Sequence, residues 1–140
     1  MTQTNSMGTP AEHKPLVKDE NGEPLQDTFN YASVVGMLLY LLGHTRPVLA
    51  YSVSQVAQFM FNPKHSHKIV IKRIGRYLIG TKDKGMIIKP TSTIGIDAYP
   101  DADFASLYGY EDNNDPVCVC SCTSYVITVA GCPIYWTSKP

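Results

Sequence analysis

The spacing of the hydrophobic residues changes near Gly85, and this change constrains the fold more than any other feature of the chain. Between residues 29 and 80, apolar residues recur at steps of three and four, which is the period of an amphipathic helix. After Gly85 they fall into short runs with strand-like content. Helices followed by strands predict an α+β fold.

Three helices are predicted in the first part. The first covers residues 29–42, and Asn30 is a candidate N-cap. The third covers residues 65–79, and Gly80 fits its C-terminal cap. Because the links between the helices are short, we expect a small antiparallel three-helix bundle.

The second helix has its own start and stop signals. Thr45 stands where an N-cap residue would, and Pro47 follows in the first turn, where a missing N–H is tolerated. Asn62 and Pro63 are expected to end the helix. One face of it is apolar, formed by Leu49, Ala50, Val53, Val56, Ala57 and Met60.

The second part of the chain predicts an antiparallel β-meander. Its strand-like runs are residues 86–89, 94–99, 124–129 and 134–137. A tight turn is expected at residues 131–133, between the last two runs, and residues 107–116 form a polar loop. No helical pattern follows, so we expect an incomplete sheet without a covering helix.

Charge is segregated along the chain, although the formal net charge is zero. The net charge is −3 in residues 1–28, +8 in residues 29–90 and −5 in residues 91–140. The first 28 residues also lack apolar periodicity and are predicted to be a disordered or extended lead-in. A basic middle followed by an acidic end indicates a part that contacts polyanions beside a part that gathers metal ions.

A membrane location is not indicated. The longest apolar run, residues 37–42, is far shorter than the roughly 20 residues that span a bilayer. The N-terminus also lacks the basic and apolar regions of a secretory signal. We therefore expect an intracellular protein, and the sequence does not distinguish a cytoplasmic from a nuclear location.

Basic residues recur at every fourth position of the third predicted helix. They are Lys64, Lys68, Lys72 and Arg76, with Arg73 beside them. This spacing forms one slowly drifting stripe, which suits a phosphate backbone bound weakly and without reading sequence. A solvated helix face has the same spacing, so both interpretations stay open.

Three aspartates form a second group of candidate site residues. Asp97, Asp101 and Asp103 share one face if residues 94–104 form one strand. Clustered carboxylates hold the two magnesium ions of many enzymes that cleave phosphodiesters. Spacing alone favours the simpler interpretation, in which Asp101 and Asp103 end a strand and open a loop.

Cysteines and histidines have spacings that do not indicate a metal site. The cysteines are Cys118, Cys120, Cys122 and Cys132. Their C-x-C-x-C pattern places thiols on one face of a strand, whereas zinc sites commonly use C-x-x-C, so we interpret them as half-buried thiols. His65 and His67 are too close for the i, i+4 pair that binds a metal on a helix, and we predict that both lie on the surface.

Four motifs follow one another between residues 31 and 81. The first holds Tyr31, Ser33, Val35, Gly36, Leu38, Tyr40 and Leu41. The second holds Thr45, Arg46, Pro47, Tyr51, Val53 and Ser54, and the third holds Phe59, Pro63 and His67. The fourth holds Arg73, Ile74, Arg76, Tyr77, Leu78, Gly80 and Thr81. Their order resembles the segment after the polymerase palm in copia-type retrotransposon Pol polyproteins, where the pattern is approximately Y-x-S-x-V-G-x-L-x-Y-L, T-R-P-D-I-x-Y-A-V-S, F-x-x-x-P-x-x-x-H and R-I-x-R-Y-L-x-G-T.

The resemblance continues into the second part and covers residues 31–139, roughly three quarters of the chain. Residues 98–105, A-Y-P-D-A-D-F-A, are similar to Y-S-D-A-D-W-A, the first strand of the family's ribonuclease H. Residues 121–126 stand where S-T-S-G-Y-V is expected, and residues 136–139 match W-x-S-K. The resemblance implies that Asp101 occupies the first catalytic carboxylate position, a ligand of Mg²⁺ in the parent enzyme.

The resemblance implies a division into a lead-in at residues 1–28, a helical segment like the reverse transcriptase thumb or connection at residues 29–84, and a truncated ribonuclease H-like segment at residues 85–140. The parent synthesises DNA from RNA and cleaves RNA in RNA–DNA hybrids during transposition. Its partners are therefore such hybrids and the remainder of the Pol polyprotein.

Departures from the family pattern predict that this chain alone is inactive. Val48, Cys120, Cys122 and Ser124 replace family residues, the polymerase's Y-x-D-D pair is absent, and the sequence stops before the E-A-E-Y pattern. We therefore expect Asp101 to be a vestigial carboxylate in an incomplete metal site, without stably bound Mg²⁺. The alternative is a domesticated, non-catalytic module that binds nucleic acid or another partner through the basic helix.

Overall fold

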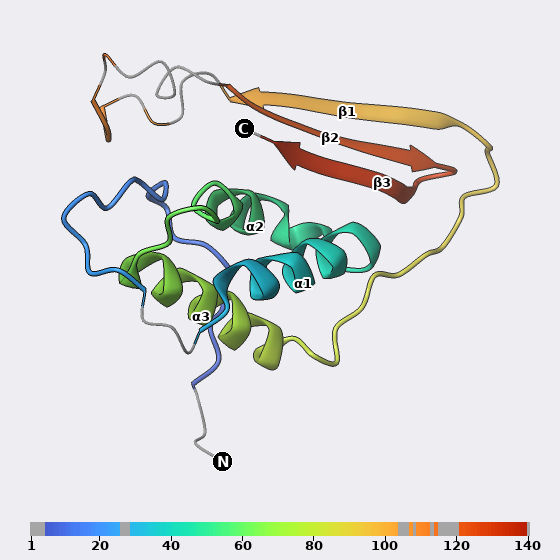
Figure 1. Ribbon diagram of the computed structural model, residues 1–140. Coiled ribbons are helices and arrows are strands. Elements are labelled where there is room, and N and C mark those ends of the chain that lie inside the picture. Colours follow the sequence, from blue (N-terminus) through green and yellow to red (C-terminus); the bar gives the residue numbers. More distant parts are fainter. Residues whose placement is uncertain are drawn as a thin grey trace.

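The computed structural model describes residues 5–25, 29–103, 107, 109–112, 114 and 121–139. In these residues a layer of helices lies against a three-stranded antiparallel sheet, as Figure 1 shows. The predicted α+β class is confirmed. The sheet is open, because no described residue pairs with the outer edge of either outer strand.

Helix α1, Tyr31–His44, begins directly after the predicted N-cap residue, Asn30, and lies two residues later than the predicted range 29–42. The side-chain oxygen of Asn30 accepts a hydrogen bond of 3.0 Å from the backbone N–H of Ser33. This bond satisfies a donor that has no partner within the helix, so the predicted N-cap is confirmed. The helix buries one apolar face, formed by Tyr31, Val35, Leu38 and Leu42.

The second helical segment differs from the prediction at both ends. It consists of a 3-10 turn, Pro47–Leu49, followed by α2, Ala50–Ala57. Thr45 is not its N-cap; its backbone N–H donates to the carbonyl of Leu41 and closes α1 instead. The segment ends well before Asn62, because hydrogen bonds to the third residue back, such as that from Phe59 N–H to Val56, tighten the chain after Ala57.

Helix α3, His65–Gly80, matches the third predicted helix. Gly80 was expected to cap it, but it is the last helical residue, and Thr81 follows at the cap position with a φ of −123°. The predicted glycine cap is wrong because the N–H of Thr81 bonds to the carbonyl of Leu78, which closes the helix without a left-handed residue. The helix buries Ile71 and Ile74.

One hydrophobic core joins the helices. Its buried members are Tyr31, Val35, Leu38, Leu42, Leu49, Val53, Val56, Ile71 and Ile74. The hydroxyl of Tyr31 donates a buried hydrogen bond of 2.8 Å to the carbonyl of Val56, which links α1 to α2. Burial raises the pKa of this hydroxyl far above its ordinary value. Because a polar group inside a core destabilises the fold unless it is hydrogen-bonded, this bond fixes how the two helices meet.

The sheet contains β1, Ile96–Asp103, β2, Cys122–Val129, and β3, Cys132–Lys139, in the order β1-β2-β3. Two of the four predicted strand runs, residues 124–129 and 134–137, lie wholly in these strands, and the run 94–99 lies in β1 from Ile96 onward. Residues 86–89 form none; they run along the exposed link to β1, where Ile87 is 85% exposed. A strand needs a partner to bond its backbone, and no described strand lies beside this run.

The hairpin between β2 and β3 turns earlier than predicted. Ala130 and Gly131 both have positive φ angles, +50° and +75°, so the turn lies at residues 130–131 and overlaps the predicted 131–133 only at Gly131. Two consecutive positive angles give the twist that joins antiparallel strands through a two-residue loop. A register shift between Ile127 and Thr128 adds a bulge nearby.

The N-terminal segment contains no helix or strand in residues 5–25, apart from one bridge between Pro24 and Lys64. It is nevertheless tied to the helices. The side-chain oxygen of Gln55 accepts 2.8 Å from the N–H of Leu16, and the carbonyl of Glu23 accepts 3.0 Å from the N–H of His65. The segment therefore follows a defined path beside α2 and α3.

Two features fall wholly or partly outside the described residues. Cys118 and Cys120 lie outside them, as do residues 108, 113, 115 and 116 of the predicted polar loop at residues 107–116. Within the described part, no helix combines the length and apolar character that a membrane crossing requires.

Candidate nucleic-acid interface and carboxylate strand

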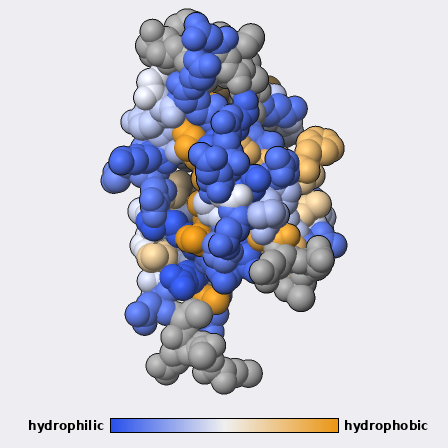
Figure 2. Space-filling view, turned by 60° about the vertical axis from the view of Figure 1, so that its left-hand side comes forward, coloured by the Kyte–Doolittle hydropathy of each residue, from blue (hydrophilic) through white to orange (hydrophobic). Residues whose placement is uncertain are grey.

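The basic residues of α3 divide between two environments. Lys72 is exposed, Lys64 and Arg76 are partly exposed, and the ammonium of Lys68 lies 5.0 Å from the centre of the Phe29 ring. Figure 2 turns the left-hand side of Figure 1 forward and shows a face on which hydrophilic residues predominate and apolar residues are scattered. Such a surface can meet a phosphate backbone without burying apolar area.

Arg73 lies in a different environment from the other four. One terminal guanidinium nitrogen donates 3.0 Å to the carboxylate of Glu12, and the other donates 3.1 Å to the hydroxyl of Thr9. Its side chain is 22% exposed, and its Nε is buried without a hydrogen-bond partner. Among the described residues, Arg73 is the one member of the five that is held in an ion pair.

His67 is buried, at 1% exposure, so the prediction of a surface histidine is wrong. Its ring stacks on Phe59 with centroids 4.1 Å apart. Nδ1 accepts 3.1 Å from the N–H of Lys64, and Nε2 lies 3.3 Å from the carbonyl of Val17, an arrangement that fits a neutral ring with its proton on Nε2. Burial lowers the pKa of His67 below its ordinary value, and Lys64 lowers it further. The third sequence motif, which places Phe59 eight residues before His67, was the signal that could have indicated this buried contact.

The three aspartates lie at alternate positions of β1, as the sequence suggested, and all are exposed. At a rise of about 3.3 Å per residue, Asp97 and Asp101 are about 13 Å apart along the strand. The strand therefore places the three on one face but spreads them along it. The described residues contain no group of three His, Cys, Asp or Glu side chains that could hold a metal ion.

Asp101 faces the helices across a narrow cleft of about 340 Å³. The cleft lies between the start of α2 and the sheet, and its lining includes Tyr51, Tyr99, Asp101, Ser124, Trp136 and Ser138. Asp101 pairs with Ser124 of β2, whose hydroxyl donates 3.1 Å to Ser138 of β3. A two-metal centre needs several carboxylates around each ion, and these neighbours do not supply them.

Tyr51 closes the cleft from α2. Burial raises the pKa of its hydroxyl, and the nearby Asp103 and Cys122 raise it further. The cleft therefore offers hydrogen-bonding groups, which are the neutral hydroxyl of Tyr51 and the hydroxyls of Ser124 and Ser138. The carboxylate of Asp101 lies at one side of it. The sequence pointed to Asp101 but did not identify Tyr51 as lining the same cleft, because the two residues lie fifty positions apart in the chain.

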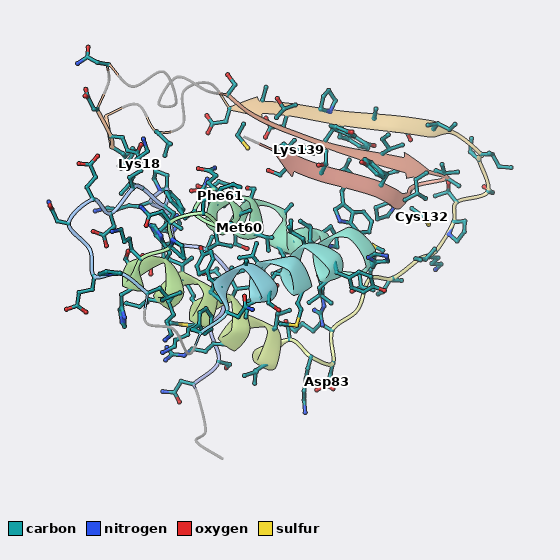
Figure 3. All side chains as sticks on the ribbon, in the orientation of Figure 1. Lys18, Met60, Phe61, Asp83, Cys132 and Lys139 are labelled. Carbon is teal, nitrogen blue, oxygen red and sulfur yellow. The ribbon has the colours of Figure 1, made fainter. Side chains whose placement is uncertain are left out.

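A second cavity, of about 490 Å³, lies beside the start of α3. Its lining includes Lys18, Gln58, Phe59, Phe61, Lys64 and His67. The Phe61 side chain is fully exposed. In Figure 3, Lys18 and Asp83 lie near opposite ends of α3, so this cavity lies at the end of the helix away from Asp83.

Comparison with known proteins shows that the chain is similar to polyproteins of transposons. The chain is 36% identical over 139 residues to a retrovirus-related Pol polyprotein from transposon RE2 of Arabidopsis thaliana, covering 99% of this chain. It is 38% identical over 109 residues to the corresponding polyprotein from transposon TNT 1-94 of Nicotiana tabacum, covering 78% of this chain. The chain spans 9% of the RE2 polyprotein and 8% of the TNT 1-94 polyprotein.

A much shorter relative is also similar. The chain is 33% identical over 109 residues to secreted RxLR effector protein 161 of Plasmopara viticola. The matched residues make up 78% of this chain and 71% of that protein. No family model matches the chain. No solved structure matches it either.

Proposed function

We propose that the chain belongs to the family of the retrovirus-related Pol polyproteins of transposons and corresponds to the copia-type segment that runs from the end of the reverse transcriptase into the start of ribonuclease H. Residues 29–84 would be the thumb or connection, and residues 85–140 the first strands of ribonuclease H. The order of elements supports this division, because three helices precede an antiparallel sheet whose first strand carries Asp101.

In this proposal the chain contacts nucleic acid and does not catalyse a reaction alone. The parent activities, RNA-directed DNA synthesis and cleavage of RNA–DNA hybrids, need metal-binding carboxylates held close together. Asp101 has Ser124 across the strand and Tyr51 across the cleft, and its fellow aspartates are spread along β1. Within the described residues, the surroundings of Asp101 therefore do not fit a two-metal Mg²⁺ centre.

The observation that carries the proposal is the set of cations on α3. Lys64, at the N-cap of α3, and Lys68, Lys72 and Arg76 within it recur at every fourth residue, while Ile71 and Ile74 pack the helix into the core. A rigid helix holds such charges at a fixed spacing, so they can neutralise successive phosphates and release counterions. Contacts of this kind carry no sequence information, so binding should be weak and independent of sequence.

Equilibrium binding of a fluorescein-labelled RNA–DNA hybrid at low salt tests this proposal. The triple variant K64Q/K68Q/K72Q should bind at least about tenfold more weakly than the unaltered chain, because each lost phosphate contact removes counterion release. The matched control K82Q/K84Q/K89Q removes the same charge from exposed lysines beyond α3. If both triple variants lose affinity equally, α3 is not the interface.

A second candidate is a domesticated module that binds nucleic acid or another partner without catalysis. One observation favours it: the RxLR effector relative is short enough that this chain spans 71% of it, so a stretch like this one occurs within a short protein. The transcript downstream of residue 140 distinguishes the two. A continuing frame that encodes E-A-E-Y supports the polyprotein segment, whereas an expressed transcript with an immediate stop supports the module.

A further inference from the structure

The described part of the acidic N-terminal segment, residues 5–25, lies beside the basic helix. Residues 1–28 carry a net charge of −3, and residues 29–90 carry +8. Polar contacts join the two at several points: Ser66 donates 2.6 Å to the carboxylate of Asp19, His65 bonds to the carbonyl of Glu23, and Arg73 bonds to Glu12. The segment therefore covers one of the five basic residues, Arg73.

The Arg73 contact has the geometry of anion recognition. Two guanidinium nitrogens point at two oxygen atoms, one from the carboxylate of Glu12 and one from the hydroxyl of Thr9, at 3.0 and 3.1 Å. The planar guanidinium fork fits carboxylates and phosphates alike, because both offer oxygen atoms at the matching separation. Glu12 and Thr9 thus present to Arg73 the groups that one phosphate would present.

We propose that Arg73 is a phosphate subsite occupied in the free protein by Glu12 and Thr9, and that the N-terminal segment competes with the nucleic-acid backbone for it. This inference rests on the proposed contact of α3 with nucleic acid. It divides the five basic residues: among the described residues, Lys64, Lys68, Lys72 and Arg76 are held in no ion pair, whereas Arg73 becomes open after Glu12 leaves.

The contact is suited to displacement. The Glu12 side chain is 69% exposed, and an exposed ion pair shifts an equilibrium by at most about fivefold. The backbone of a hybrid can displace it, because neighbouring phosphates are held at the same time by the lysines of α3. Arg73 is less exposed than Glu12, so the arginine stays in place while the carboxylate moves.

Removing the competitor should strengthen binding. In the full chain, E12Q should bind a labelled RNA–DNA hybrid about two- to fivefold more tightly at low salt, since the ion pair it removes is of that strength. The gain should shrink as the salt concentration rises, because salt screens the ion pair that E12Q removes, whereas the bound chain contacts the same phosphates in both cases. The matched control is E23Q, which removes one charge from an exposed side chain of the same segment.

The arginine variants complete the test. In the R73Q background, E12Q should give no gain, because the subsite is gone. R73K keeps the charge but loses the fork, so it should keep most of the affinity and show a reduced response to E12Q. Thermal unfolding of each variant shows whether it folds, and R73K supplies the comparison if R73Q does not.

The outcomes separate the two proposals. If the unaltered chain binds the hybrid with the expected salt dependence but E12Q gains no more than E23Q, the subsite inference is wrong and the α3 interface stands. A gain for E12Q that persists in R73Q also overturns the inference. If the unaltered chain shows no salt-dependent binding at all, the proposed function itself fails.

Discussion

The indole Nε1 of Trp136, in the last strand, donates a hydrogen bond of 2.7 Å to the carbonyl oxygen of Leu42 in α1. Leu42 lies in the last turn of α1, where helix carbonyls lack partners within the helix. Trp136 also packs against the core that the helices form. One side chain therefore satisfies the end of a helix and attaches the sheet to the helical layer.

Replacing Trp136 by Phe should reduce the free energy of unfolding by about 1 to 3 kcal/mol, because the carbonyl of Leu42 loses its donor inside the interface between the layers. Urea unfolding followed by circular dichroism measures this. I134V, at a position of the same strand that is 59% exposed, serves as control and should change little. Equal stability of W136F and the unaltered chain would show that the bond does not hold the layers together.

Stability should fall as the pH is lowered below 6.5, and His67 should cause part of this fall. Burial lowers the pKa of His67 below its ordinary value of 6.5. The unfolded chain therefore binds a proton at a higher pH than the folded chain does, so protonation favours unfolding from about pH 6.5 downward until the folded state also takes up the proton.

Urea unfolding at pH 7.5 and pH 5.5 tests the role of His67. H67Q should lose part of the difference between the two pH values, although it is also destabilised at both because a buried, stacked ring is removed. H65Q, at the exposed neighbouring histidine, should keep the full difference. If H67Q and H65Q respond to pH alike, His67 does not carry the effect.

The helices were predictable because their signals are local. The bond from Ser33 to Asn30 and the apolar face of α1 both arise within a few residues, and the structure confirms them. The β1–β2–β3 order also follows from consecutive strand-like runs. Thr45 was misassigned because a threonine before Pro47 suits the end of one helix as well as the start of the next.

The site was less predictable because its contacts join distant parts of the chain. Lys72 and Arg73 are adjacent in sequence, but adjacent positions of a helix point about 100° apart. Lys72 is therefore exposed, whereas Arg73 contacts the N-terminal segment. The bond between Arg73 and Glu12 spans 61 residues, and that between His67 and Val17 spans 50. No periodicity within α3 could indicate either.

The purified chain should not cleave the RNA strand of an RNA–DNA hybrid with Mg²⁺ or Mn²⁺, because the carboxylates of β1 are spread along a strand rather than gathered around an ion. D101N should behave as the unaltered chain does in a gel assay with labelled RNA. Cleavage that disappears in D101N would show instead that Asp101 is part of a working metal site.

The salt dependence of hybrid binding tests the central claim, that α3 holds a phosphate backbone, most directly. If Lys64, Lys68, Lys72 and Arg76 each neutralise one phosphate, the slope of log affinity against log salt should be about −3 to −4. It should become shallower by about two to three in K64Q/K68Q/K72Q, in proportion to the contacts removed. An affinity that does not change between low and physiological salt, or a slope that the triple variant leaves unchanged, would contradict the account.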